Sequence, residues 1–212
     1  MENFFNLKFK SNHKKNGAMR EQVRTKYEMV DGMGSEREVF EFSYALCKLL
    51  KPAYVLETGT WKGHCALYIC KALKEDGVGG KLITIEYDED KFAEAKETLA
   101  SQGFQDQSVC VLGDSANFDY SALMSPGSKF GLAYFDCGDR EFAFKNVHDR
   151  GLVDNETIFL LHDTTIAGNG GSIGVARNEA FRIPNDIMQV KLFINVTPRG
   201  IMLGKLNKES KK

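Results

Sequence analysis

The sequence lacks the features that would assign it to several large protein classes. Its 212 residues carry 28 Lys and Arg against 29 Asp and Glu, which gives a formal net charge of -1. A charge this close to zero argues against nucleic acid as the main partner. No stretch is long and apolar enough to span a bilayer, and the basic N-terminus has no following apolar run of a signal peptide. We therefore expect neither a nucleic-acid partner nor a membrane partner.

Paired cysteines are missing as well. The 5 cysteines are odd in number, and none of them forms a CxxC pair. They lie within apolar patterns, where a free thiol behaves as a small hydrophobic side chain. Free thiols are typical of a reducing compartment, so we predict a cytoplasmic protein.

The common phosphate-binding loops are also absent. In "VLETGTWKGH" an apolar strand ends near Glu57, and Gly59 and Gly63 lead into a helix. A dinucleotide loop would need glycine where Trp61 stands, and a P-loop would need a G-K-[ST] run. The remaining E-x-G-x-x-x-G pattern suits a ligand without phosphate. Glu57 would then accept from a cationic or amino-bearing group of that ligand.

Short apolar runs alternate with amphipathic helical segments along most of the chain. We predict parallel strands within 53–57, 81–86, 108–114, 130–136 and 157–163, and a final hairpin within 188–206. A helix over 35–51 should begin with a capping box of Ser35 and Glu38. The pattern predicts a doubly wound α/β domain over 33–206, with an antiparallel strand at its C-terminal end. Residues 1–32 would form a basic arm or lid, and residues 207–212 a disordered tail.

A carboxylate stands at the end of each of the five predicted parallel strands: Glu57, Glu86, Asp114, Asp136 and Asp163. The carboxyl ends of parallel strands meet at one edge of a sheet, where ligands bind in this class of fold. Like charges crowded at one edge repel one another, so a purely structural purpose is hard to supply. The acids therefore predict a shared ligand site. Glu86 could accept the hydroxyls of a ribose, and Asp114 with Ser115 could read the edge of an adenine.

These motifs resemble those of class I S-adenosylmethionine-dependent methyltransferases. The similar stretches are "VLETGTWKGH", "TIEYDEDKFAEAKE", "GDS", "LAYFDCGD", "FLLHDTT" and "RGIMLGKL", which lie in order within residues 33–206. The likeness is to small-molecule O-methyltransferases of the catechol and caffeoyl-CoA branch and of the sugar- and macrolide-modifying branch. It implies a Rossmann-like fold with a mostly parallel, seven-stranded sheet.

The resemblance also implies roles for individual residues. Glu57, Gly59, Thr60 and Gly63 would line the methionine end of the cofactor, Glu86 would bind the ribose, and Asp114 with Ser115 would contact the adenine. Asp136 would face the methionine amine, a metal, or both.

The catechol branch adds a magnesium ion held at the ends of the fourth and fifth strands, which are Asp136 and Asp163 here. That branch has a lysine base where this chain has Asp139, so the need for the metal stays open. Asp139 and His162 are the candidate bases. His162 should point away from Asp163 unless the strand has already ended, because neighbouring strand residues face opposite sides.

The predicted function is methyl transfer from S-adenosylmethionine to a hydroxyl of a small sugar, polyketide or phenolic acceptor. One alternative is a binding module that keeps the nucleoside pocket without catalysis. Another is an oxygenase relative with iron at Asp136, His162 and Asp163. The glycine-rich loop within 164–186 and the basic arm would border the acceptor pocket, and the loop could also mediate a homodimer.

Overall fold

The computed structural model describes residues 35–164 without a gap. It also describes residues 27, 30, 183, 187, 188, 190–194, 197 and 199–208. The predicted N-terminal arm and the predicted loop over 164–186 fall almost entirely outside these residues, and the predicted tail is described only at residues 207 and 208.

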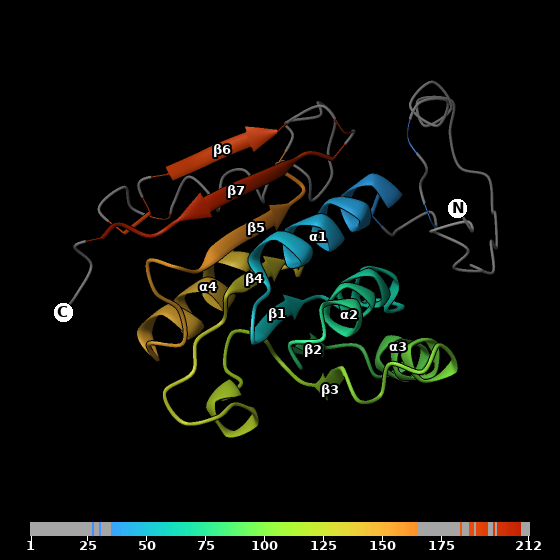
Figure 1. Ribbon diagram of the computed structural model, residues 1–212. Helices are drawn as coiled ribbons and strands as arrows, with labels where there is room; N and C mark the ends of the chain where they lie inside the picture. The colour runs from blue at the N-terminus through green and yellow to red at the C-terminus, as the bar shows by residue number, and fades with distance from the viewer. Residues whose placement is uncertain are drawn as a thin grey trace.

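A seven-stranded sheet forms the centre of the fold, in the order β3-β2-β1-β4-β5-β7-β6 (Figure 1). The strands are β1 Tyr54–Thr58, β2 Lys81–Glu86, β3 Ser108–Leu112, β4 Leu132–Phe135, β5 Ile158–His162, β6 Val190–Ile194 and β7 Ile201–Lys205. The first five strands run parallel, whereas β7 is antiparallel to both β5 and β6. The predicted fold class, including the antiparallel C-terminal hairpin, is therefore confirmed.

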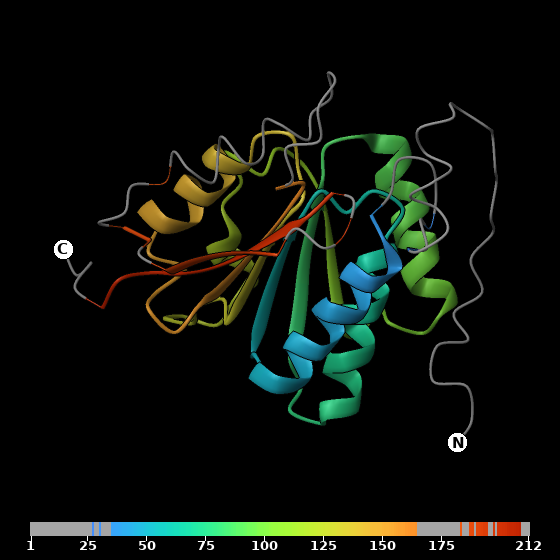
Figure 2. The same cartoon turned by 90° about the horizontal axis from the view of Figure 1, so that it is seen from above.

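Helices cover both faces of this sheet. They are α1 Arg37–Leu50, α2 His64–Asp76, α3 Glu89–Ser101 and α4 Arg140–Asp149, with a short 3₁₀ helix η2 Tyr120–Leu123. α1, α2 and α3 lie on one face and α4 lies on the other (Figure 2). Both faces are thus shielded from water, which explains the nearly continuous apolar character of the central strands.

The alternation of strand side chains decides which residues face which helices. Val55 and Leu160 pack in the cluster formed with α1 and α2, whereas their neighbours Leu56 and Phe159 pack in the cluster that contains Phe144 of α4. Residues two positions further along a strand return to the same face. Four polar side chains near the strand ends therefore lie on the α1 face: Glu57, Thr84, Tyr134 and His162.

The predicted capping box at the start of α1 is wrong. The N-cap position belongs to Glu36, and no side-chain hydrogen bond caps the helix. Ser35 instead donates its hydroxyl to Asp136 Oδ2 at 2.8 Å. A tertiary partner has replaced the local one, because the start of α1 lies against the carboxyl end of β4.

All 5 cysteines are free thiols, in agreement with the prediction from their spacing. Within the described part of the chain, no helix combines the length and the apolar character that crossing a bilayer requires.

Candidate functional site

A cavity of about 540 Å³ opens at the carboxyl ends of β1 to β4. Of the predicted cofactor residues, it is lined by Glu57, Gly59, Thr60, Glu86, Asp114, Ser115 and Asp136. The predicted base Asp139 also lines it, as does Arg199 from the link between β6 and β7. Acids that are far apart in the sequence thus share one hollow. Gly63, His162 and Asp163 are not among its lining residues.

The turn between β1 and α2 brings the backbone close to the end of β4. Gly59 has a φ of +83°, and a Cβ atom on it would lie 2.5 Å from the carbonyl oxygen of Asp136. Gly63 has a φ of +78°, and a Cβ there would lie 3.2 Å from Cα of Ala95 in α3. Gly59 therefore keeps the turn tight beside the cavity, whereas Gly63 lets the turn pack against α3.

Trp61 lies within this turn and lines the cavity. Its backbone is in the left-handed region, with a φ of 51°. Its N–H donates to Glu86 Oε2 at 2.7 Å, and its ring lies under Lys91 Nζ, 4.9 Å from the ring centroid. The large side chain is thus accommodated between the turn and α3.

Glu57 is a buried acid at the floor of the cavity, with 1% of its surface exposed. Its Oε2 accepts a hydrogen bond from the hydroxyl of Thr84 at 2.6 Å, and that hydroxyl lies 2.5 Å from the hydroxyl of Thr60. Burial raises the pKa of Glu57 to about 8, and the negative charges of Asp136 and Glu86 act in the same direction. The unliganded protein therefore holds a neutral carboxylic acid here, which can release its proton to pair with a cation.

Glu86 is held in place by backbone amides. Its Oε1 accepts from the N–H of Tyr87 at 2.9 Å and from that of Asp88 at 3.0 Å, while Trp61 occupies Oε2. This carboxylate ends β2 and joins the β2–α3 turn to the β1–α2 turn. A ligand meets a preformed acceptor here, not a mobile side chain.

Asp114 follows β3 and caps the next turn. Its Oδ1 accepts from the N–H of Ala116 at 2.9 Å, and its Oδ2 accepts from Asn117 Nδ2 at 2.6 Å. Ser115 donates to the sulfur of Cys137 at 3.6 Å. The two predicted adenine contacts thus form part of the cavity wall.

A group of six side chains with three acids, two guanidiniums and one imidazole lies where β4 and β5 end. We call it the charge cluster; its members are Glu36, Asp136, Arg140, His162, Asp163 and Arg199.

Asp136 is the member of the cluster with the most donors around it. Besides Ser35, the hydroxyl of Tyr134 donates to Oδ2 at 3.1 Å, and Arg140 Nη2 donates to Oδ1 at 3.1 Å. Burial by itself would raise the pKa of Asp136, but the positive charges of His162 and of the arginines hold it well below its usual value. Asp136 is therefore an anion with its charge already balanced.

Asp163 is buried and paired with both arginines. Arg140 Nη2 lies 2.9 Å and Arg199 Nη2 lies 2.7 Å from Asp163 Oδ2, and Arg199 Nε donates to Oδ1. The pKa of Arg199 is raised even though burial opposes this, because Asp163 accepts its hydrogen bonds and carries the opposite charge.

His162 is fully buried between two carboxylates. Its Nδ1 lies 3.0 Å from Asp136 Oδ1, and its Nε2 lies 2.9 Å from Glu36 Oε2. Burial favours the neutral ring, but the charge of Asp136 and the two hydrogen bonds raise the pKa of His162 to about 9. Both ring nitrogens of this imidazolium donate, so it is poorly suited to accept a proton from a substrate.

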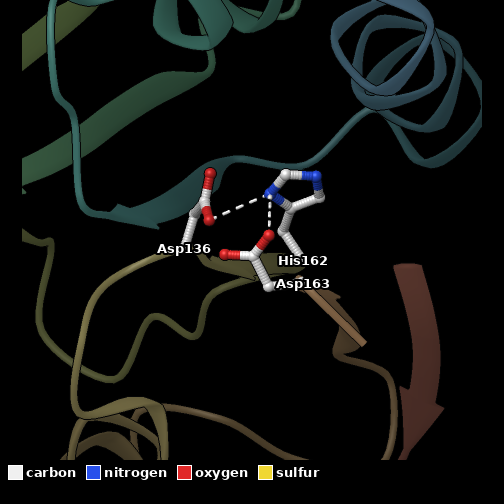
Figure 3. Close-up of side chains that lie close together, drawn as sticks. All are labelled: Asp136, His162 and Asp163. Carbon is white, nitrogen blue, oxygen red and sulfur yellow. Dashed lines mark hydrogen bonds and ion pairs between the residues drawn. The ribbon is translucent and has the colours of Figure 1, made fainter. Parts of the chain in front are cut away.

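Asp163 and His162 face the same cluster although they are consecutive residues. β5 ends at His162, and Asp163 turns into the left-handed region with a φ of 61°. Figure 3 shows that both Asp136 and Asp163 are directed at the same ring nitrogen of His162. The sequence predicted that both side chains could enter one site only if the strand ended before Asp163. β5 does end at His162, so this condition is met.

A metal ion fits the spacing of this cluster but not its chemistry. Asp136, His162 and Asp163 each offer a ligand atom, and these atoms lie within 4.8 Å of one another. Spacing alone would admit an ion. However, magnesium requires oxygen ligands that are free to coordinate it, and here the carboxylates are bonded to guanidiniums. Because both carboxylates are paired with guanidiniums, the residues as arranged do not fit magnesium, or iron bound through His162.

Sequence reasoning missed the positive half of this cluster. Arg140 begins α4, four residues after Asp136, but Asp136 lies outside that helix, so helical spacing did not predict this pair. Arg199 precedes β7, and the pairing of His162 with Ile201 brings it beside the end of β5. The contact of Arg199 therefore required the strand register, and that of Arg140 required the turn between β4 and α4.

Comparison with known proteins agrees with this architecture. A family model described as a methyltransferase domain matches residues 56–164, which is more than half of the chain. A methyltransferase from Podospora anserina, solved with S-adenosylhomocysteine bound, shares 19% identity with a TM-score of 0.68, over 88% of this chain and 85% of that one.

Two bacterial structures are similar to the same extent. An O-methyltransferase from Bacillus cereus in complex with S-adenosylhomocysteine has 14% identity and a TM-score of 0.67, over 83% of this chain and 84% of the other. The O-methyltransferase TomG from Streptomyces achromogenes, in complex with S-adenosylmethionine, has 18% identity and a TM-score of 0.65, over 82% of each chain. At these identities the likeness establishes the fold. Taken with the family match, it shows that the chain belongs to the methyltransferase-domain family, with the class I fold of the small-molecule O-methyltransferases.

Proposed function

We propose that this protein transfers a methyl group from S-adenosylmethionine to a hydroxyl of a small-molecule acceptor. The observation that carries the proposal is the convergence of Glu57, Glu86, Asp114 and Asp136 on one cavity of about 540 Å³. S-adenosylmethionine bears a sulfonium and an ammonium group, so a cavity lined by carboxylates is complementary to it in charge. The family match and the S-adenosyl compounds bound by similar structures support the same ligand.

The residues present fit such a ligand. Glu57, Gly59 and Thr60 would hold the methionine end, where a neutral acid can become the partner of an ammonium group. Each carboxylate offers about four lone-pair positions, and three backbone donors occupy three of those on Glu86, so its Oε2 can still accept from one ribose hydroxyl. Asp114 and Ser115, which also line the cavity, would contact the adenine.

The chain's own task in the reaction is to align the acceptor oxygen and to take its proton. S-adenosylmethionine supplies a methyl group on a positively charged sulfur, which an oxygen nucleophile attacks in line. Of the two candidate bases, Asp139 lines the cavity and is exposed at the start of α4, whereas His162 is buried, charged and outside the lining. We therefore assign the proton transfer to Asp139.

The proposal also covers the metal ion, the acceptor class and the cellular location. We include no metal ion, because Asp136 and Asp163 are already paired with arginines. A small-molecule acceptor and a cytoplasmic location belong to the same proposal. A homodimer stays a prediction from the sequence.

Calorimetry with S-adenosylhomocysteine tests the proposal. The wild type should bind it, and Glu86→Ala should weaken binding by about 1–3 kcal/mol, because a ribose hydrogen bond to a charged acceptor is lost. Glu86→Gln keeps one acceptor oxygen and should lose less. Glu97→Ala removes a carboxylate from an exposed position of α3 and serves as the matched control. Wild-type protein that binds no S-adenosylhomocysteine would sink the proposal.

A panel of sugar, polyketide and phenolic acceptors then separates the enzyme from a binding module. Turnover of any acceptor, reduced by Asp139→Asn at unchanged affinity for S-adenosylhomocysteine, supports the assignment of the base. Binding without turnover across the panel would favour the non-catalytic module, for which the absence of a lysine at position 139 is the motivating observation.

A further inference from the structure

We propose that the guanidinium groups of Arg140 and Arg199 occupy the place of a divalent cation between Asp136 and Asp163, so that this protein works without a metal ion at that site. The inference about the metal depends on the geometry of the charge cluster alone. Its consequence for the acceptor also depends on the proposed methyl transfer.

Arg140 bridges the two carboxylates through a single atom. Its Nη2 lies 3.1 Å from Asp136 Oδ1 and 2.9 Å from Asp163 Oδ2. A metal ion held between the two acids would compete with Arg140 for these carboxylates. Arg140 has 4% of its surface exposed, so this contact is buried and shielded from competing water.

Arg199 completes the arrangement from the other side. Its Nε and Nη2 donate to the two oxygens of Asp163, which is the two-pronged geometry that guanidinium and carboxylate groups prefer. Its backbone N–H donates to Glu36 Oε1 at 2.9 Å, so the main chain is also held. Of the two arginines, Arg199 lines the cavity and Arg140 does not.

The charges of the cluster leave no place for a divalent ion. Three acids face two guanidiniums, and the two ring nitrogens of His162 lie 2.9 Å from Glu36 Oε2 and 3.0 Å from Asp136 Oδ1. Guanidinium groups do not lose their protons in proteins, so neither arginine can become neutral to make room. An ion between Asp136 and Asp163 would have to displace the side chains of Arg140 and Arg199. Residues from three segments hold these arginines: the end of β4, the end of β5 and the start of α1.

The acceptor therefore meets a different surface than a metal ion would provide. Chelation by a metal selects acceptors with two adjacent oxygens that can both coordinate the ion. Arg199 instead offers a fixed positive charge beside Asp136 at the cavity wall. An acceptor with a single hydroxyl, or with a carbonyl or carboxylate oxygen near it, satisfies this wall by hydrogen bonds.

Manganese is a suitable probe, because it binds carboxylate sites made for magnesium and is seen by electron paramagnetic resonance. We expect full-length wild type to bind no Mn²⁺ in a saturable way at millimolar concentration, with or without S-adenosylhomocysteine. The double variant Arg140→Met and Arg199→Met removes both guanidiniums and should gain a saturable Mn²⁺ site. Adding Asp163→Asn to it should remove that site again. Arg150→Met, which removes an arginine that is paired with Asp119 and belongs neither to the charge cluster nor to the cavity lining, should create none.

The outcomes separate cleanly. Saturable Mn²⁺ binding by the wild type that Asp163→Asn abolishes would overturn the inference, as would a folded double variant that binds no Mn²⁺. Where the double variant does not fold by circular dichroism, the wild-type titration decides: saturable Mn²⁺ binding that Asp163→Asn abolishes overturns the inference, and the absence of such binding supports it. Binding of S-adenosylhomocysteine to wild type in EDTA is measured alongside. Its absence would refute the proposed function without touching the manganese result.

Discussion

Glu57 should make the unliganded protein lose stability as the pH rises through neutrality. Its pKa is about 8 in the folded protein, against an ordinary value of 4.5, chiefly because it is buried. The folded protein thus binds this proton more tightly than the unfolded chain does. The contribution of Glu57 to stability is complete below pH 4.5 and is lost as the pH rises toward 8.

The size of the effect follows from the two pKa values. A tenfold change in proton affinity corresponds to about 1.4 kcal/mol, so full ionisation of Glu57 costs about 5 kcal/mol of the free energy of unfolding. Between about pH 5.5 and pH 8.5, linkage predicts that Glu57 lowers the free energy of unfolding by about 3 kcal/mol. This is a large fraction of the stability of an ordinary domain.

Urea unfolding at several pH values and constant ionic strength measures this directly. Glu57→Gln keeps the shape of the side chain and the acceptor for Thr84 but cannot ionise. It should therefore flatten the pH dependence by about 3 kcal/mol over that window and should be more stable than wild type at the alkaline end. Glu97→Gln removes a carboxylate from an exposed position of α3 and should leave the wild-type pH dependence unchanged.

Parallel stability curves of wild type and Glu57→Gln between pH 5.5 and 8.5 would contradict the raised pKa of Glu57. Parallel curves would mean that Glu57 is ionised at neutral pH in the folded protein, stabilised by contacts other than those to Thr84. Glu57 would then not be a neutral acid at the floor of the cavity, and it would have no proton to release when a cationic ligand binds.

Two further substitutions test the geometry around the cavity. Gly59→Ala should lower the free energy of unfolding by about 1–3 kcal/mol because of its left-handed backbone alone. The loss should be larger still, because the new Cβ meets the carbonyl oxygen of Asp136. We expect a lower Tm and weaker S-adenosylhomocysteine binding. Gly127→Ala, with a φ of +79° and nothing within 4 Å of its Cβ, isolates the backbone part, and equal losses in both variants would contradict the steric argument. Ser35→Ala removes a donor from Asp136 and should lower the free energy of unfolding by about 1–3 kcal/mol in urea. Ser101→Ala at the exposed end of α3 is its control, and equal midpoints would show that the Ser35 contact adds nothing.

The sequence determined the layout of the fold and the place of the cavity. Apolar strands in alternation with amphipathic helices admit few arrangements besides a parallel sheet covered on both faces. Parallel strands end at one edge, so a carboxylate at the end of each strand is brought near the others whatever the details of packing. This is why Glu57, Glu86 and Asp114 could be placed in one site from their positions alone.

The tertiary structure decided how those acids are balanced. Ser35 donates to Asp136 and does not cap α1. Arg199 lies beside Asp163 because of the register of β7 against β5. His162 and Asp163 share the cluster because β5 ends at His162. Each of these contacts joins segments more than twenty-five residues apart. Local sequence patterns carry no information about such partners, because the choice is made by which strand ends and loops the completed sheet brings together. The sequence alone showed how many acids end the strands. Only the tertiary structure could decide whether a metal ion or arginines neutralise them.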